Sequence, residues 1–395
     1  MAEAPASVIV AGGGVGGLEA ILALRELAPK LEIELLTDSE TFRFEALAVA
    51  EPFGSGPPAE LGVAEFCSEH GVRLRRDRLA EIWHEQQRLL TDGGEDVPYD
   101  ALVLSPGARR QTPAAEGRNR LEGARPAVVF TGTHEAPAVE EAIAAAAAEG
   151  SRITFEVPAG PCWPLPLYEL ALGAAARLDG TGASVALETP EGAPLERLGA
   201  GLSERVAAIL AEFGVIFAST RMRARPPAPD LDAWRVTIPE LDVPEIPGLP
   251  QESHGFIPTD PAMKVPGVQR VWAVGDATWF PLKQGGLAAE QADVAAAQVA
   301  FELGEINSVD ERVARFVPVL RAALMTPDGP RFLRAAGDGS DAVSGEAPLW
   351  WPPAKVAGRL LAPYMAGRKD SAFGTEDLRD LAPESTHPDD YADAI

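Results

Sequence analysis

Apolar residues along the chain form short runs that alternate with longer segments of helical spacing. Residues 7–11 have the composition of a buried strand, a glycine-rich turn follows, and residues 18–27 have helical spacing that ends before Pro29. This pattern predicts an α/β protein with two Rossmann-like, doubly wound domains. The other predicted strands include 31–37, 152–157 and 184–191, and the other predicted helices include 140–150, 167–178 and 202–215.

The turn after the first predicted strand has the spacing of a dinucleotide-binding fingerprint. Gly12, Gly14 and Gly17 fit the pattern G-x-G-x-x-G. In this pattern the first glycine permits a tight turn, the second lets the backbone approach a pyrophosphate, and the third lets helix and strand pack closely. The start of the helix offers free N–H groups to the phosphates. Asp38 lies 21 residues after Gly17, where a carboxylate would accept hydrogen bonds from a ribose.

Two later segments distinguish between NAD and FAD. Residues 97–113 form an apolar strand that ends in a Pro-Gly turn at Gly107. Residues 268–301 form a strand that ends at Gly275 and Asp276 and is followed by an alanine-rich helix. Both segments resemble the flavoproteins with two dinucleotide-binding domains, in which such strands complete the FAD site.

This resemblance implies roles for residues of the second segment. Asp276 would bind the ribityl chain or the pyrophosphate of FAD. The helix start at Gly286 and Leu287 would face the pyrimidine edge of the flavin, where a helix N-terminus stabilises negative charge. Lys283 would act in the same way.

The chain therefore leaves its first domain and later returns to it. The FAD-binding domain is expected at residues 1–118 and 253–312, with an inserted NAD(P)-like Rossmann domain at 119–252. A C-terminal region with an amphipathic helix is expected at 313–370, and its Pro- and Gly-rich part before residue 348 predicts loops over the flavin face. Residues 371–395 predict an acidic, disordered tail.

The first turn of the inserted domain lacks a second fingerprint. It reads VPAGPCWPLPLYEL, with Gly160 as its one glycine and prolines where backbone N–H groups would face a pyrophosphate. Trp163 fills space that a cofactor would need. The turn argues against tight NAD(P)H binding without excluding it. Cys162 has two interpretations: a small buried hydrophobic residue, or a thiol near the flavin that the following helix start makes reactive.

Five motifs resemble the group of sulfide:quinone oxidoreductases and type II NADH dehydrogenases. They are AGGGVGGLEA, YDALVLSPGA, VWAVGDAT, KQGGLAAEQA and PLWWPPAKVAGRLLAPYM. Cys162 stands in the segment where the sulfide-oxidising members have a cysteine close to the flavin. Those enzymes need a second cysteine in their C-terminal part, and residues 163–395 contain none. Two-cysteine sulfide oxidation is therefore not expected unless Cys67 approaches Cys162.

Residues 349–369 form the most basic stretch of an acidic chain. Lys355, Arg359, Arg368 and Lys369 accompany an apolar stripe and a pair of tryptophans. The segment fits a helix that begins at Pro352 and lies on a membrane surface, as in quinone-reducing relatives. It fits equally an amphipathic helix packed on the FAD domain or against a partner in a homodimer.

Composition narrows the remaining choices. A net charge of −25 argues against a nucleic-acid partner. No apolar window has the length of a membrane-spanning helix, and the first residues lack the pattern of a secretory signal. Two cysteines predict no disulfide framework, so we expect a cytoplasmic protein, free or peripheral on the inner face of the membrane. The five histidines show no ligand spacing, and no metal site is predicted.

Two functional hypotheses follow. The first is an FAD-dependent oxidoreductase that passes electrons from NAD(P)H or a sulfur compound through flavin to a quinone or a similar small acceptor. Cys162 and Lys283 are its candidate catalytic residues. The alternative is a flavin-binding, redox-responsive or scaffolding protein without efficient turnover, which the altered turn and the missing second cysteine favour.

Overall fold

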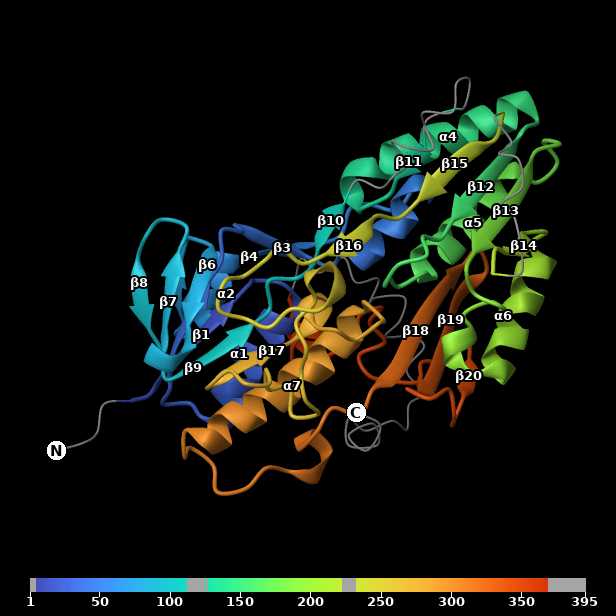
Figure 1. The fold of residues 1–395 in the computed structure, drawn as a ribbon. Helices are drawn as coiled ribbons and strands as arrows, with labels where there is room; N and C mark the ends of the chain where they lie inside the picture. Colours follow the sequence, from blue (N-terminus) through green and yellow to red (C-terminus); the bar gives the residue numbers. More distant parts are fainter. Residues whose placement is uncertain (1–4, 112–124, 126, 222–231, 369–395) are drawn as a thin grey trace.

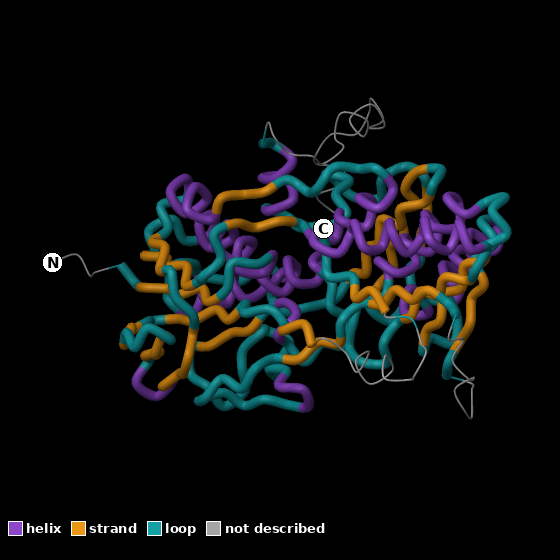
Figure 2. The backbone as a smooth tube through the Cα atoms, turned by 90° about the horizontal axis from the view of Figure 1, so that it is seen from above, coloured by secondary structure: helices purple, strands orange, loops and turns teal. Residues whose placement is uncertain are grey.

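The computed structural model describes residues 5–111, 125, 127–221 and 232–368. The expected domain boundary at residues 118 and 119 and the expected acidic tail lie outside these residues. Figure 1 shows two lobes, with the N-terminal strands in one and the middle of the chain in the other. Figure 2 shows the same two lobes side by side from above, each with strands and helices.

The first domain is built on a parallel sheet with the strand order β17-β9-β1-β2-β5. Side chains of β1 serve two cores. Val8 and Val10 pack with the helices α1 and α7, whereas Ile9 and Ala11 pack with the three-stranded sheet on the opposite face. Both faces are covered, which explains why the central strands are continuously apolar. The bounds are β1 Ser7–Ala11, β2 Glu32–Leu36, β5 Arg73–Arg75, β9 Ala101–Leu104, β17 Val271–Ala273, α1 Val15–Leu27 and α7 Gly285–Glu302.

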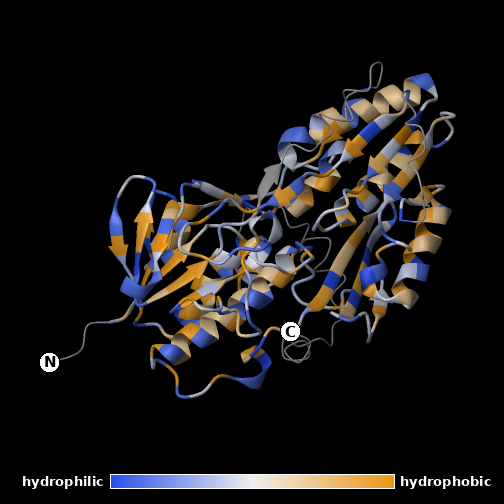
Figure 3. Cartoon of the chain, viewed as in Figure 1, coloured by the Kyte–Doolittle hydropathy of each residue, from blue (hydrophilic) through white to orange (hydrophobic). Residues whose placement is uncertain are grey.

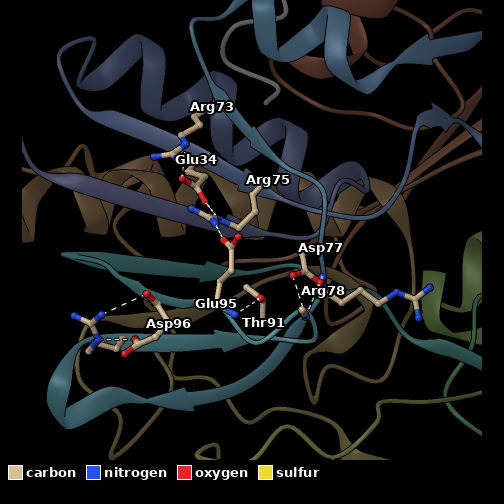
Figure 4. Close-up of polar contacts among 10 residues, drawn as sticks. Glu34, Arg73, Arg75, Asp77, Arg78, Thr91, Glu95 and Asp96 are labelled. Carbon is tan, nitrogen blue, oxygen red and sulfur yellow. Dashed lines mark hydrogen bonds and ion pairs between the residues drawn. The ribbon is translucent and has the colours of Figure 1, made fainter.

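A network of charged residues joins the first parallel sheet to the antiparallel sheet β6-β7-β8 (Figure 4). Arg75 of β5 contacts both Glu34 of β2 and Glu95, the residue directly before β8. Arg73 approaches Glu34 at 3.3 Å. Through these contacts Arg75 links the edge of the parallel sheet to the antiparallel sheet. The antiparallel strands are β6 Leu79–Trp83, β7 Arg88–Thr91 and β8 Asp96–Pro98, and nearby elements are β3 Thr41–Arg43, β4 Glu60–Gly62, α2 Val63–Glu69 and the 3₁₀ segment η1 Glu45–Phe53.

The inserted domain has a second parallel sheet, with the order β11-β15-β12-β13-β14. Its strands are mainly hydrophobic in Figure 3, as expected for a sheet covered by helices. Gly150 ends α4 in the left-handed conformation (φ 61°), as the sequence predicts. The bounds are β11 Ala127–Val129, β12 Arg152–Glu156, β13 Ser184–Thr189, β14 Ile216–Ser219, β15 Trp234–Thr237, α4 Ala136–Glu149, α5 Leu165–Leu178 and α6 Ala200–Glu212.

Two of the crossings between the domains run side by side as one short ribbon. Strand β10 (Arg109–Gln111) leads out of the first domain, and β16 (Glu240–Asp242) leads back. The two strands pair antiparallel over three residues each, Arg109 opposite Asp242 and Gln111 opposite Glu240. Figure 1 shows this ribbon between the lobes.

The prediction of loops between residues 313 and 347 is wrong. This region forms an antiparallel sheet of β18 (Val319–Thr326), β19 (Gly329–Ala336) and β20 (Val343–Gly345). The Pro327-Asp328 pair, taken as loop, is a two-residue hairpin connection between Thr326 and Gly329. Leu320, Ala322 and Leu324 of β18 pack into the core of the inserted domain. The remaining elements are α8 Leu361–Ala366 and the 3₁₀ turns η2 His84–Gln86, η3 Thr133–Glu135, η4 Glu196–Leu198, η5 Ser253–Gly255, η6 Gly275–Ala277 and η7 Glu311–Val313.

Candidate functional site

The three fingerprint glycines occupy different surroundings in the turn between β1 and α1. Gly12 has a φ of +116°, and a Cβ atom there would lie 1.9 Å from the carbonyl oxygen of Ser105. A Cβ on Gly17 would lie 1.9 Å from the carbonyl oxygen of Gly12. A Cβ on Gly14 would meet nothing within 4 Å. Gly12 and Gly17 are therefore needed for packing, whereas Gly14 borders open space at the start of α1.

The N-terminus of α1 has the properties of an anion site. Gly14 is its N-cap residue and supplies no side chain to the first turn, and that turn contains no acidic residue. The first hydrogen bond of the helix runs from Leu18 N to Gly14 O, at 3.0 Å. The preceding N–H groups of the first turn and the positive end of the helix dipole face the space beside Gly14.

Asp38 lies just beyond β2, and its carboxylate is already engaged. Arg78 Nε donates a hydrogen bond of 2.7 Å to Asp38 Oδ2. Both side chains are exposed, with relative areas of 49% for Asp38 and 66% for Arg78. Figure 4 shows Arg78 extending away from the network around Glu34. A ribose at Asp38 would share this carboxylate with Arg78, a residue that the sequence did not identify.

The carboxyl ends of three neighbouring strands converge beside the glycine turn. Ser105, which follows β9, is buried, and its side chain would lie 2.9 Å from a Cβ on Gly16 and 3.8 Å from one on Gly275. Gly275 N donates a hydrogen bond of 2.7 Å to Gln291 Oε1 of α7. Gly107 has a φ of +69° and open space around it. The structure thus brings the segments of Gly12, Gly107 and Gly275 to one edge of the first sheet.

The start of α7 meets the C-terminal segment of the chain. A Cβ on Gly285 would lie 2.8 Å from Val356, and one on Gly286 would lie 3.2 Å from the carbonyl oxygen of Ala357. The glycines therefore permit this close approach. Leu287 is buried in the core of the inserted domain. The expected role of Gly286 rested on the family resemblance, and the packing against Ala357 supplies a separate reason for a glycine at this position.

Gln284, the N-cap residue of α7, is a site residue that the sequence analysis missed. Its amide nitrogen donates to the carbonyl oxygen of Arg321. Its Oε1 atom is buried and has no hydrogen-bond partner among the described residues. A buried acceptor without a partner at a helix start is suited to an N–H donor from a bound molecule. The only sequence signal was the polar residue directly before the Gly-Gly pair.

Lys283 is buried rather than exposed to solvent. Its Nζ donates a hydrogen bond of 2.6 Å to the carbonyl oxygen of Thr278 and lies 3.8 Å from the ring centroid of Phe256. Burial lowers the pKa of Lys283 to about 8, although the nearby carboxylate of Asp276 acts in the opposite direction. The lysine and the aspartate that the sequence singled out therefore lie within electrostatic reach of each other.

Cys162 lies in the turn between β12 and α5 and packs against the core of the inserted domain. Burial raises the pKa of its thiol to about 12, and the negative charge of Glu191 acts in the same direction. Glu191 accepts hydrogen bonds from Tyr168 Oη at 2.6 Å and Thr189 Oγ1 at 3.0 Å. The start of α5, with Pro164 as its N-cap residue, does not produce the lowered pKa that a reactive thiol requires.

The two cysteines of the sequence form no disulfide. Cys67 is buried in the core of the first domain, and burial raises the pKa of its thiol to about 11. Cys162 belongs to the other core. The structure therefore gives no support to a redox pair between them.

Alkylation of Cys162 tests the state of its thiol. We expect iodoacetamide at pH 8 to modify Cys162 in the folded protein about a hundredfold more slowly than in the urea-unfolded chain, because only the thiolate reacts. The measurement is mass spectrometry of the Cys162 peptide over time. Equal rates in both states would show that the thiolate is present in the folded protein.

The C-terminal segment, residues 349–368, is packed against the rest of the chain, with several of its apolar side chains in the core of the first domain. The prediction of an amphipathic helix from Pro352 onwards is wrong. The helix in this segment, α8, has six residues, Leu361–Ala366. Lys355 forms a buried ion pair with Glu169 of α5, at relative side-chain areas of 6% and 1%. Arg359 Nη2 lies 3.0 Å from Asp293 Oδ1, and Arg368 Nη2 lies 2.6 Å from Glu65 Oε1. The predicted basic face therefore binds carboxylates of the same chain.

The described part of the chain contains no group of three side chains suited to a metal ion. None of its helices has the length and apolar character needed to cross a membrane.

Comparison with known proteins finds a family match in the first third of the chain and one curated relative over a similar share of it. Residues 6–136 match the model of the pyridine nucleotide-disulphide oxidoreductase family. A sulfide-quinone reductase of Aquifex aeolicus is 26% identical over 167 residues, which make up 42% of this chain. The match spans 37% of that reductase, so the chain aligns with little more than a third of the curated relative.

Solved structures resemble the chain over most of its length. The sulfide:quinone oxidoreductase from Aquifex aeolicus has a TM-score of 0.70 at 19% identity, with 86% of each chain covered. A NAD-dependent persulfide reductase from A. fulgidus has a TM-score of 0.57 at 18% identity, covering 84% of this chain and 64% of that one. At these identities the likeness shows a shared fold.

Proposed function

We propose that this chain, which belongs to the superfamily of pyridine nucleotide-disulphide oxidoreductases with two dinucleotide-binding domains, is an FAD-dependent oxidoreductase. The observation that carries the proposal is the open space beside Gly14 at the uncapped start of α1. The flanking glycines cannot hold side chains, and the N–H groups there suit a pyrophosphate. The residues present therefore fit a dinucleotide.

Three parts of the cofactor have groups on this chain that suit them. The first turn of α1 would bind the pyrophosphate, and Asp38 would accept hydrogen bonds from the ribose while Arg78 holds its carboxylate. The start of α7 would favour negative charge on the pyrimidine edge, and Gln284 Oε1 would accept a hydrogen bond there. The flavin, when bound, supplies transfer of two electrons between donor and acceptor.

Lys283 would hold positive charge near the start of α7, and its lowered pKa makes this charge depend on pH near neutrality. The side chain is a charged ammonium below about pH 8 and a neutral amine above it. Its charge would therefore favour electron uptake at neutral pH and lose this effect in alkaline solution.

Substitution of Lys283 tests this role. We expect Lys283→Met to retain FAD and to slow flavin reduction about tenfold at pH 7. The wild-type rate should fall above about pH 8, where Lys283 loses its proton. The Lys283→Met profile should lack this fall, and Lys283→Arg should stay fast at higher pH. Stopped-flow absorbance under anaerobic conditions measures all three, and identical pH profiles would remove Lys283 from the mechanism.

The donor and the acceptor are proposed by chemical class. NAD(P)H or a small sulfur compound would approach from the inserted-domain side, and a quinone or a similar small molecule would receive the electrons. Prolines in the turn before α5 withhold N–H groups from a pyridine nucleotide, and Cys162 has no partner cysteine, so neither donor has a complete site of the usual kind.

These two deficiencies favour a second candidate function, a flavin-binding, redox-responsive or scaffolding protein without efficient turnover. The absorption spectrum of the purified protein, followed anaerobically with NADH, NADPH and sulfide, separates the two functions. Bleaching within seconds by any of these donors supports the enzyme and contradicts the second candidate. Absence of a flavin spectrum even after incubation with FAD contradicts both.

The membrane contact expected from residues 349–369 can be tested with liposomes. The three basic side chains that the structure describes there, Lys355, Arg359 and Arg368, each contact carboxylates of the same chain. We therefore expect the intact protein to stay in the unbound fraction when floated with vesicles containing anionic lipid at physiological salt. Co-flotation that salt reverses would restore the membrane interpretation of the sequence.

A further inference from the structure

Four carboxyl groups and two guanidinium groups gather where α1, α7, β18 and the C-terminal segment meet. Glu19 and Glu26 come from α1, and Glu290 and Asp293 come from α7. Arg321 comes from β18 and Arg359 from the C-terminal segment, and Lys355 of that segment is paired with Glu169 of α5. Glu19 is fully buried, and the side chains of Asp293 and Glu290 are 8% and 19% exposed.

Every carboxylate in this cluster has a defined contact, and Glu26 Oε2 accepts a hydrogen bond of 2.7 Å from Arg359 Nη1. Glu290 binds Arg321 and accepts a hydrogen bond of 3.1 Å from Val319 N. Asp293 Oδ1 accepts hydrogen bonds of 3.0 and 3.2 Å from Arg359. Glu19 accepts hydrogen bonds of 2.7 Å from each of the backbone N–H groups of Leu360 and Leu361.

The charges in the cluster do not balance when every carboxyl group is ionised. Three largely buried negative charges, on Glu19, Glu290 and Asp293, would face two positive charges, and the half-exposed Glu26 would add a fourth negative charge. An excess of buried negative charge is unfavourable in a low-dielectric surrounding. Burial, the largest effect, raises the pKa of Glu290 to about 7 and that of Glu19 to about 8, and it also raises the pKa of Asp293. The cluster can therefore hold an exchangeable proton near neutral pH.

A small hollow gives this cluster access to water. It is bordered by Glu290, Asp293, Arg321 and Arg359 and by the rings of Trp350 and Trp351. The cavity volume is about 20 Å³, enough for about one water molecule. A quinone ring does not fit there, whereas a proton can pass through a single water molecule.

Glu290 also lies close to the end of α7 where the flavin edge is proposed. It follows Gly286 by four residues, which is about 6 Å along a helix axis. Negative charge that develops at the start of α7 therefore acts on the Glu290 carboxylate over a short path through protein. Asp293 lies on the same face of the helix one turn further away.

We propose that Glu290 is a proton-accepting residue coupled to the redox state of the bound flavin. The inference rests on the proposed function. Reduction by two electrons would bring two protons to the protein. One accompanies the electrons to the flavin, carried by the donor when it transfers a hydride and taken from solvent otherwise, and the other comes from solvent and forms an O–H bond with a Glu290 carboxylate oxygen. When the electrons pass to a quinone-type acceptor, the two protons leave with them or return to solvent, and Glu290 is ionised again. Reduction therefore adds no net charge to the protein, whereas reduction without proton uptake by Glu290 would add one negative charge.

The test is a count of protons per electron pair in the FAD-loaded full chain. Spectroelectrochemical titration gives the flavin midpoint potential at each pH, and its slope gives the proton count. We expect close to two protons per electron pair around pH 7 in the wild type and close to one in Glu290→Gln. Glu302→Gln, at the far end of the same helix and outside the cluster, should keep the wild-type value.

The outcomes separate this inference from the proposed function. A flavin spectrum with a wild-type count of one proton overturns the Glu290 proposal and leaves the FAD assignment intact. A count of two that Glu290→Gln does not change also overturns it. Failure to bind FAD would instead overturn the proposed function. If Glu290→Gln does not fold, photoreduction of the wild type beside a pH-indicator dye still gives the proton count directly.

Discussion

Replacing Gly17 with alanine is expected to lower both the free energy of unfolding and the affinity for FAD. The added Cβ would lie 1.9 Å from the carbonyl oxygen of Gly12, a contact that only movement of the backbone can relieve. We expect a loss of about 3 kcal/mol in the free energy of unfolding. Urea denaturation measures the stability, and quenching of FAD fluorescence by the apoprotein measures the affinity.

Gly14→Ala is the matched control from the same turn. Its Cβ meets no protein atom within 4 Å, and the backbone conformation there (φ −86°) suits alanine. Stability should change by less than about 0.5 kcal/mol, whereas FAD affinity should fall about tenfold or more, because the methyl group stands where the pyrophosphate would approach. Unchanged FAD affinity in a stable Gly14→Ala protein would show that the pyrophosphate does not lie at the start of α1.

The second large effect is expected at the ion pair between Lys355 and Glu169. Lys355→Met would leave the Glu169 carboxylate buried without its partner, and we expect a loss of about 3–5 kcal/mol in the free energy of unfolding. The double variant Lys355→Met with Glu169→Met should recover most of this loss, since both charges are then absent. Recovery should be incomplete because Met325 N loses its acceptor, Glu169 Oε1, at 2.9 Å.

A double-mutant cycle from urea denaturation at pH 7 measures this coupling. Glu302→Gln, which removes the partner of the partly exposed Lys264, provides the comparison and should cost less than about 1 kcal/mol. A similarly small loss in Lys355→Met would show that the pair is hydrated in solution and does not hold the C-terminal segment in place.

Local signals in the sequence identified the parallel sheets well. Strand β1 occupies residues 7–11 and α5 overlaps the predicted helix at 167–178, because apolar runs and glycine turns are set by nearby residues. The antiparallel sheet of β18 and β19 was missed for the opposite reason. Its hairpin turn contains proline and glycine, which also mark loops, and its strands are stabilised by the core of the inserted domain rather than by their own pattern.

Contacts between distant parts of the chain account for the other errors. The basic residues of the C-terminal segment suggested a surface helix, because nothing in the sequence shows that Lys355 meets Glu169, 186 residues away. Glu19 carried a signal that could have been used: it is the one charged residue in the apolar stretch from Val15 to Leu24 of α1, and such residues are buried only with partners. Its partners, the N–H groups of Leu360 and Leu361, come from the opposite end of the chain.

The paired strands β10 and β16 are only one of the connections between the two domains. Leu287 of α7 and three side chains of β18 lie in the core of the inserted domain, so the two domains share apolar contacts beyond the ribbon. The ion pair of Lys355 with Glu169 ties α5 of the inserted domain to the C-terminal segment on the first domain. Separation of the domains therefore requires the shared apolar surface to meet water and a buried lysine and a buried glutamate to become hydrated together.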